Sequence, residues 1–222
     1  MPRLADEHLE TRIVQAARKL WQTHGGKSLT LRSVARAAGT TTTTVYKRFR
    51  NKEALLLALA EAVQARLTAR TTSAATIEDS YRRFLDFADK HPHEYKLLWG
   101  PSWAELLGPK RPRPIKDWLL DKFAERFGGE PGDYVLNYYA LFLLVHGTAN
   151  LLIVTRHRRM KAEMVDSCLA ICDALVANIG VLRRQPLTRT AGLQSDPGVT
   201  PSVPGNSQRK FPPRRKTSRQ SP

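Results

Sequence analysis

Cysteine is almost missing from this 222-residue sequence, in which Cys168 and Cys172 are the only two. A disulfide framework is therefore not indicated, and a reducing compartment is the expected environment. The first ten residues, MPRLADEHLE, contain no apolar run, so the sequence gives no sign of a secretory signal. Together these absences predict a cytoplasmic protein.

Motifs that carry enzymatic chemistry are missing as well. The sequence has no Gly-rich phosphate loop, no Gly-x-Ser-x-Gly elbow and no His-Glu-x-x-His helix. Cys168 and Cys172 are four residues apart, but no further ligand accompanies them as a metal site would require. We interpret them as small buried hydrophobic residues, with a redox pair as the alternative. We expect no catalytic residue, no metal and no cofactor, so a helical enzyme is disfavoured.

Acidic residues are few compared with basic ones. The chain has 36 Lys and Arg against 20 Asp and Glu, a formal net charge of +16. Such a surplus favours a polyanionic partner. Nucleic acid, an acidic membrane and a ribosomal surface all fit the charge, so charge alone does not choose among them.

One apolar stretch, residues 136–154, is nearly long enough to span a bilayer. It nevertheless contains Asn137, His146 and Asn150, and the last two fall on one helical face. Polar groups are costly in lipid. A buried helix of a bundle is therefore favoured over a membrane span, and no membrane partner is expected.

Strand-like alternation is missing, while nearly every segment has helical periodicity. This predicts an all-α fold of about nine helices, with prolines and glycines in the joints. The predicted helices are residues 6–24, 31–38, 42–49, 52–71, 76–91, 93–107, 113–128, 132–156 and 160–184.

The segment from Thr30 to Lys52 carries the most specific pattern. It predicts a helix capped by Thr30, a tight turn at Gly39, a second helix, and a restart capped by Asn51. Apolar residues at helical spacing would pack these helices on residues 6–24 as a three-helix head. This arrangement is typical of a helix-turn-helix reader of DNA.

The remaining residues of this segment are hydroxylic or cationic: Thr40, Thr41, Thr42, Thr43, Thr44, Tyr46, Lys47, Arg48 and Arg50. Hydroxyl groups donate to phosphate oxygens, and threonine methyls can contact thymine methyls. The alternative is that the threonines only cap the helix and the basic residues form a solvated face. Their position within a helix-turn-helix pattern favours DNA binding.

Residues 13–21, 31–39 and the motif Tyr46-x-x-Phe49-x-x-Lys52-Glu53 resemble the N-terminal domain of TetR-family transcriptional regulators. The resemblance covers about residues 7–67 and implies that the helix at 42–49 enters the major groove. It implies base contacts by Thr42, Thr43 and Lys47, and backbone contacts by Thr30, Thr41, Thr44, Tyr46 and Lys52. Thr40 and Thr43 depart from the usual family residues, so the operator sequence is not transferable.

The same resemblance implies a helical effector-binding and dimerisation domain at residues 72–185. Residues 144–147, Leu-Val-His-Gly, are similar to a Trp/Leu-His-Gly element of one C-terminal subclass. A ligand pocket is predicted from aromatic and polar residues, although each could equally fill the core. Its predicted members are Phe87, Trp99, Trp103, Trp118, Tyr139, Phe142, His146 and Asn150.

Two helical faces are predicted to form a homodimer through a four-helix interface. One consists of Leu141, Leu144, Val145, Thr148 and Leu152, and the other of Met164, Cys168, Ile171, Leu175 and Ile179.

Residues 186–222 lose the helical pattern and contain seven Lys or Arg but one Asp. This composition predicts a disordered basic tail, which either adds phosphate contacts or only aids solubility. The whole chain is thus predicted to be a sequence-specific DNA-binding transcriptional regulator, a repressor released from a palindromic operator by a small organic effector. The alternative is a constitutive or architectural DNA-binding protein without an effector.

Overall fold

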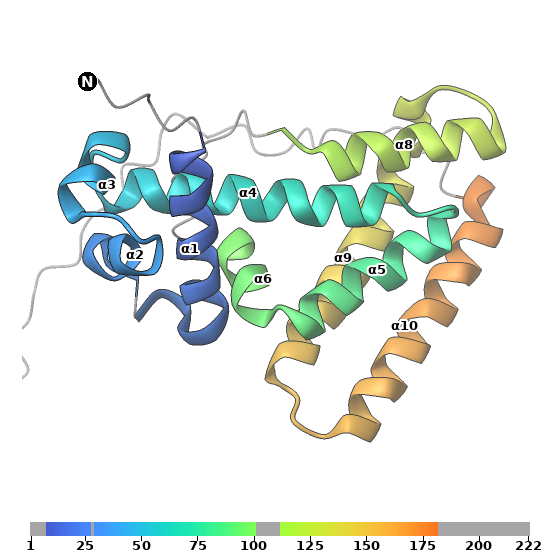
Figure 1. Ribbon diagram of the computed structural model, residues 1–222. Helices are drawn as coiled ribbons and strands as arrows, with labels where there is room; N and C mark the ends of the chain where they lie inside the picture. Colours follow the sequence, from blue (N-terminus) through green and yellow to red (C-terminus); the bar gives the residue numbers. More distant parts are fainter. Residues whose placement is uncertain (1–7, 28, 101–111, 182–222) are drawn as a thin grey trace, which may run out of the picture. The chain divides into compact units, whose positions relative to one another are not determined.

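The computed structural model describes residues 8–27, 29–100 and 112–181. Over these ranges the chain forms nine α-helices and no strand, which confirms the predicted all-α class (Figure 1). The helices are α1 (Leu9–His24), α2 (Leu31–Ala37), α3 (Thr42–Arg48), α4 (Lys52–Thr72), α5 (Ile77–Lys90), α6 (Pro92–Trp99), α8 (Pro114–Phe127), α9 (Val135–Val154) and α10 (Arg158–Ala177). Short 3-10 turns occupy Gly25–Lys27, Pro131–Tyr134 and Ile179–Val181.

Side-chain caps and glycine turns fix the first helices where the sequence predicts them. The Thr30 hydroxyl accepts from the Ser33 amide at 3.0 Å, and the Asn51 carboxamide oxygen accepts from the Ala54 amide at 2.8 Å. Gly39 has a φ of +65°, a conformation that costs glycine little and that reverses the chain between α2 and α3. The predicted caps and turn are therefore confirmed.

Three predicted helix bounds are wrong. Helix α6 ends at Trp99 because Gly100 takes an extended backbone, and the rest of the predicted 93–107 helix lies outside the described residues. The segment predicted at 132–156 begins as a 3-10 turn, so α9 starts only at Val135. Helix α10 ends at Ala177 rather than 184 and is followed by another 3-10 turn.

The head consists of α1, α2, α3 and the first half of α4. Helix α1 contacts α2 and α4, and α2 contacts α3 (Figure 1). Apolar side chains from all four helices are fully buried there: Ile13, Val34, Val45 and Leu55. Burying such a side chain stabilises the fold by roughly 1.5–3 kcal/mol. The outward residues of α3 are thus held on a packed scaffold.

Helix α4 continues from the head into the body without a break. Its 21 residues extend roughly 30 Å at 1.5 Å per residue. Its contacts include α1 in the head and α5, α6 and α8 in the body. The predicted division between residues 67 and 72 falls in the last turns of this helix and stays a prediction. The predicted tail, 186–222, lies outside the described residues.

Helix α9 has one face inside the body and another exposed. Among the described residues, 131–154 is the one segment long and apolar enough to cross a membrane by length and composition. Leu141, Val145 and Leu152 on this helix are nevertheless buried, and α9 contacts α5 and α10. This burial fits a helix of the core.

The dimer faces predicted from the sequence are wrong because most of their residues already pack inside one chain. The buried members are Leu141, Val145, Thr148 and Leu152 on α9, with Cys168 and Ile179 in and after α10. Of the predicted members, Ile171 is exposed, and the other large apolar side chains that these helices leave exposed are Leu143, Leu151, Val154 and Met160. The helical periodicity therefore predicted these helices, but it took the face that packs inside the chain for the face that contacts a second subunit.

Candidate DNA-binding surface and ligand cavity

The start of α3 is fixed by two of its threonines. The Thr41 hydroxyl accepts from the Thr44 amide at 3.1 Å, and the two hydroxyl oxygens are 2.8 Å apart. Capping is therefore a real role of Thr41, as it is of Thr30. Because the two hydroxyl groups share one hydrogen bond, one of their hydrogens stays available for a phosphate oxygen.

The outward face of α3 carries the residues that the sequence assigns to DNA. Thr43 and Lys47 are exposed, and Tyr46 is exposed over 55% of its surface although it is a large aromatic residue. Val45 is buried on the opposite side, and Phe49, which follows the helix, is buried too. One side of α3 therefore belongs to the core and the other to solvent.

Four of the eight predicted DNA-binding residues meet in one shallow hollow. Its lining comes from the starts of α2 and α4 and from α3: Thr30, Leu31, Arg32, Thr42, Tyr46, Arg50, Asn51 and Lys52. Arg32, Arg50 and Lys52 give this hollow three cations, and amide groups at a helix start also favour phosphate. Arg50 is among the predicted outward residues but was given no contact, whereas Arg32 was missed. Arg32 follows the capped start of α2 by two residues, which is the signal that could have found it. The other four predicted residues, Thr41, Thr43, Thr44 and Lys47, do not line the hollow.

A buried carboxylate connects the head to the body. Glu94 on α6 has no exposed surface. It accepts from Arg66 Nη1 on α4 at 2.6 Å and from Gln22 Nε2 on α1 at 2.9 Å. Trp21 Nε1 on α1 also donates to the His93 carbonyl at 2.8 Å. We refer to Glu94, Arg66, Gln22 and their neighbours as the Glu94 junction, which sequence reasoning missed because its members are far apart in the chain.

A histidine completes the Glu94 junction. His91 Nε2 lies 3.0 Å from Arg66 Nη2, and since a guanidinium group only donates, the ring nitrogen accepts. Burial, together with the charge of Arg66, lowers the pKa of His91. The Phe87 ring lies 5.5 Å from the Arg66 guanidinium carbon. Phe87 thus belongs to this junction and does not line the cavity described next.

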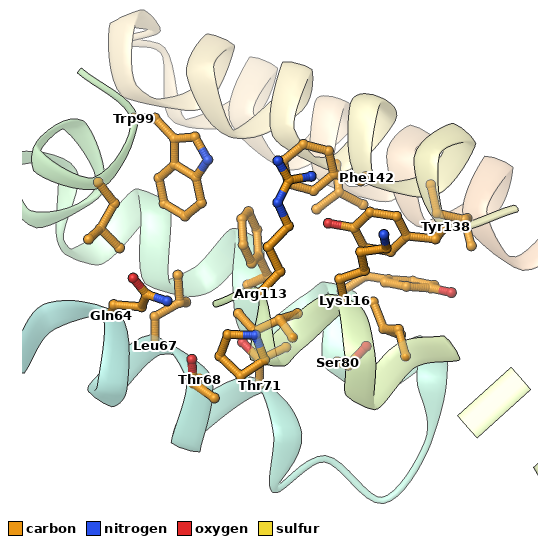
Figure 2. Close-up of a pocket in the computed structure, with 18 of the residues that line it drawn as sticks. Gln64, Leu67, Thr68, Thr71, Ser80, Trp99, Arg113, Lys116, Tyr138 and Phe142 are labelled. Atoms are coloured by element: carbon orange, nitrogen blue, oxygen red, sulfur yellow. The ribbon is translucent and has the colours of Figure 1, made fainter. Parts of the chain in front are cut away.

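The body contains a partly open cavity of about 260 Å³ (Figure 2). Its walls come from α4, α5, α6, the start of α8 and α9. The aromatic residues of its described lining are Tyr81, Phe84, Trp99, Tyr138, Tyr139 and Phe142. Burial raises the pKa of Tyr138 to about 12, which keeps its phenol neutral.

Three of the eight predicted pocket residues, Trp99, Tyr139 and Phe142, lie on the cavity wall. Phe87, Trp118, His146 and Asn150 are not among the lining residues, and Trp103 lies outside the described residues. His146 supports the wall from behind, because its ring stacks on Phe142 with centroids 5.3 Å apart. The Asn150 amide donates to the His146 carbonyl at 2.9 Å, within the same helix.

The position of His146 is set by Tyr95. The tyrosine oxygen lies 2.5 Å from His146 Nδ1. Burial raises the pKa of Tyr95 and lowers the pKa of His146, so a protonated hydroxyl donates to a neutral ring. Over residues 8–27, 29–100 and 112–181, no group of three or more His, Cys, Asp or Glu side chains is placed to hold a metal ion.

The sequence model of the tetR family of bacterial regulatory proteins matches residues 13–59, which include α2, α3 and most of α1. No curated protein matches the sequence. Solved structures match its fold. A TetR-type transcriptional regulator from Streptomyces coelicolor is 21% identical with a TM-score of 0.59, covering 82% of this chain and 100% of its own.

Two structures from Acinetobacter baumannii AYE are also similar in fold. TetR from this organism is 19% identical with a TM-score of 0.58, covering 82% of this chain and 99% of its own. A TetR variant in complex with minocycline is 21% identical with a TM-score of 0.56, covering 79% of this chain and 95% of its own. The family's sequence model falls on the helices that present the outward face of α3, and the fold extends over the body. Residues 13–59 thus match the tetR family of bacterial regulatory proteins, and the fold of the described chain is similar to that of solved TetR-type regulators.

Proposed function

We propose that the protein is a homodimeric repressor that binds a palindromic operator and leaves it when a small organic effector occupies the body. The observation that carries this proposal is the outward face of α3, where hydroxyl and cationic groups project from a packed three-helix scaffold. Such a face suits the major groove, which admits one α-helix. The proposed site of action is the cytoplasm.

Each residue of the surface has a proposed role. Thr42, Thr43 and Lys47 contact base edges, because they lie in the first two turns of the exposed helix. Contacts with the DNA backbone come from the residues around them: Thr30, Thr41, Thr44, Tyr46 and Lys52. We add Arg32 and Arg50 to this second group, since they share the hollow with Tyr46 and Lys52. Phosphate contacts set the register, and base contacts provide the specificity.

Dimerisation is proposed through the exposed apolar residues of α9 and α10. Six large hydrophobic side chains are exposed among the described residues, and five belong to these two helices or border them: Leu143, Leu151, Val154, Met160 and Ile171. Residues 143, 147 and 151 are at four-residue spacing, so they form one stripe with Gly147 between two leucines. A two-fold axis would pair this stripe with its own copy and place two heads on one palindrome.

Effector release is proposed to act through helices that the cavity and the Glu94 junction share. Helix α4 contributes Leu67 to the cavity wall and Arg66 to the junction. Helix α6 contributes Trp99 to the wall and Glu94 to the junction. A ligand that shifts these helices would alter the tie to α1 and therefore the position of the head. A ligand changes DNA affinity only by binding one of the two states more tightly.

The first experiment is selection of bound sequences from a random pool of DNA duplexes at moderate salt. We expect a palindrome with two half-sites, which supports a dimeric, sequence-specific regulator. Recovery of no motif, with tight binding that disappears as salt rises, would favour the architectural alternative. If an operator is found but no ligand changes its affinity, a constitutive regulator remains.

A further inference from the structure

We infer that the cavity binds small aromatic carboxylic acids, with the carboxylate at the start of α8 and a second polar group at the far side. The inference rests on the proposed effector role of the cavity and names the chemical class of the effector. Three features of the lining support it: two cations, an aromatic wall, and buried hydroxyl groups that lack partners.

The first feature is a pair of cations where α8 begins. Arg113 is the residue before the helix, Lys116 lies in its first turn, and both line the cavity. Neither forms an ion pair with any carboxylate in the described part of the chain. Arg113 Nη1 is 3.4 Å from the Tyr139 hydroxyl oxygen, and Lys116 Nζ is 5.6 Å from the Tyr139 ring centroid. These contacts leave most of their donor capacity for an anion, and the start of a helix adds a favourable partial charge.

The charge of the lining is of one sign. No Asp or Glu is among the described residues that line the cavity. A cationic ligand would therefore be repelled by Arg113 and Lys116, and the described lining offers it no carboxylate. An anionic ligand would find charge-assisted hydrogen bonds from a planar guanidinium group, whose geometry matches a carboxylate. The lining thus selects for negative charge.

The second feature is the aromatic wall, which favours a flat apolar body. Trp99 and Phe142 lie along one part of the cavity, and Tyr138 lies beside Lys116 (Figure 2). Aromatic rings in contact gain from stacking beyond the area that they bury. A volume of 260 Å³ is somewhat below the usual range for ligand pockets, so it suits one or two fused rings.

The third feature is a set of buried hydroxyl groups. Thr68, Thr71 and Tyr81 all line the cavity, and their oxygens are buried without a hydrogen-bond partner in the described structure. Thr71 and Tyr81 are only 2% and 3% exposed. A buried polar group without a hydrogen-bond partner destabilises the fold, because it has lost its hydration. Burial raises the pKa of Tyr81, so the phenol keeps its proton and donates. A ligand oxygen that accepts from Tyr81 would remove part of this cost.

Two of the buried hydroxyl groups, those of Thr68 and Thr71, lie across the cavity from the Arg113 guanidinium group. Figure 2 shows Thr68 and Thr71 on α4 at one side and the guanidinium group of Arg113 beside Phe142 at the other. The inferred ligand therefore has its carboxylate at one end of the ring system and a hydroxyl or carbonyl oxygen at the other. A ring acid with a distal hydroxyl has this arrangement.

The test compares four probes that share one naphthalene body. They are 2-naphthoic acid, 2-naphthamide, 2-naphthylmethylamine and 6-hydroxy-2-naphthoic acid, which is the acid with a hydroxyl at the opposite end. Binding to the full chain is measured by thermal shift and by quenching of tryptophan fluorescence, since Trp99 lines the cavity. We expect 2-naphthoic acid to bind at least about tenfold more tightly than the amide, the amine not to bind detectably, and the hydroxy acid to bind most tightly.

Matched variants locate the site. Arg113→Gln and Lys116→Gln should each weaken the acid at least about fivefold and leave the amide unchanged. Lys122→Gln is the control, because Lys122 is on the same helix and has the same charge but pairs with Glu125 outside the cavity lining. Tyr81→Phe should remove the advantage of the hydroxy acid and spare 2-naphthoic acid.

The inference is overturned if the amide or the amine binds as well as the acid, or if neither acid binds. It is also overturned if Lys122→Gln weakens the acid as much as Arg113→Gln does. Release of the selected operator duplex is measured separately. If an acid binds through Arg113 but leaves operator affinity unchanged, the inference stands and the proposed effector release fails. If the amine binds and releases the operator duplex, the inference fails and the proposed effector release stands.

Discussion

The DNA-binding surface and the cavity are built in opposite ways. All residues of the surface lie between Thr30 and Lys52, and it faces solvent on a scaffold fixed by caps at Thr30, Thr41 and Asn51. The described lining of the cavity extends from Gln64 to Val145, over five helices, and contains polar groups without partners. The candidate surface is thus held by its own caps and core, whereas the cavity wall contains buried hydroxyl groups without hydrogen-bond partners in the described structure.

Under the proposed function, this difference makes the connection between the two regions important for regulation. Since the scaffold of the surface is already packed, we expect an effector to move the whole head and not to reshape α3. Within the described chain, the polar ties between α1 and the body converge on Glu94 and on the His93 carbonyl. Changes at the junction should therefore have larger consequences than changes in either region alone.

The largest effect is expected from Glu94→Ala. The substitution leaves Arg66 and Gln22 without the buried carboxylate that they share. Loss of one partner of a buried ion pair typically costs 3–5 kcal/mol. Because Arg66 is about a third exposed, we expect a loss near the lower limit, about 3 kcal/mol in the free energy of unfolding. Urea denaturation at pH 7.5 measures it.

An exposed ion pair supplies the control for this substitution. Glu163 pairs with Arg159 at 3.0 Å on the surface of α10. Exposed pairs contribute little, so Glu163→Ala should change the free energy of unfolding by less than about 0.5 kcal/mol. Equal losses for Glu94→Ala and Glu163→Ala would show that the junction does not tie the head to the body.

The next largest effect is expected from charge on the exposed face of α9. Leu143→Glu and Leu151→Glu together would place four carboxylates in an apolar dimer interface. We expect the dimer dissociation constant to rise at least about hundredfold, or roughly 2.7 kcal/mol. Sedimentation velocity measures it, with Lys122→Glu on α8 as a dimeric control. Because both leucines are exposed in the single chain, the substitutions should not disturb its core, and the helical circular dichroism signal should stay unchanged. A dimer that survives both substitutions would place the interface elsewhere.

The same contrast explains how much could be predicted from the sequence. Caps at Thr30 and Asn51 and the turn at Gly39 act through residues three or four positions apart, so their positions were predicted. Phe87 and Trp99 are both aromatic residues with helical spacing around them, and no local signal distinguishes the junction from the cavity wall. That distinction depends on which distant helix each side chain meets. The inner and outer faces of α9 were confused for the same reason, since both are apolar.

Substitutions on the DNA-binding surface should have smaller effects that differ in kind. Tyr46→Ala and Lys52→Ala should weaken binding to all duplexes alike, by about 1 kcal/mol each, and reduce the salt dependence. Thr42→Ala and Lys47→Ala should instead change the preferred sequence, losing roughly 1–3 kcal/mol of discrimination at one base pair. Fluorescence anisotropy with operator and scrambled duplexes separates the two patterns. Uniform losses from all four would show that the base and phosphate roles are wrongly assigned.

The smallest effect is expected from the titration of two histidines, one in the junction and one behind the cavity wall. The pKa values of His91 and His146 are lowered by burial, and Arg66 lowers that of His91 further. The unfolded chain therefore binds more protons than the folded chain as pH falls through the ordinary histidine range near 6.5. Their contribution to stability is full above that pH and is lost progressively below it.

Replacing either histidine with glutamine should flatten this dependence. A glutamine oxygen can still accept from Arg66 in place of His91, or from Tyr95 in place of His146, but it does not take up a proton. Urea denaturation at pH 7.5, 6.5, 5.5 and 5.0 should show that His91→Gln and His146→Gln each lose less stability on acidification than the parent chain. If the free energy of unfolding of both variants falls with pH in parallel with that of the parent chain, neither histidine contributes to the pH dependence.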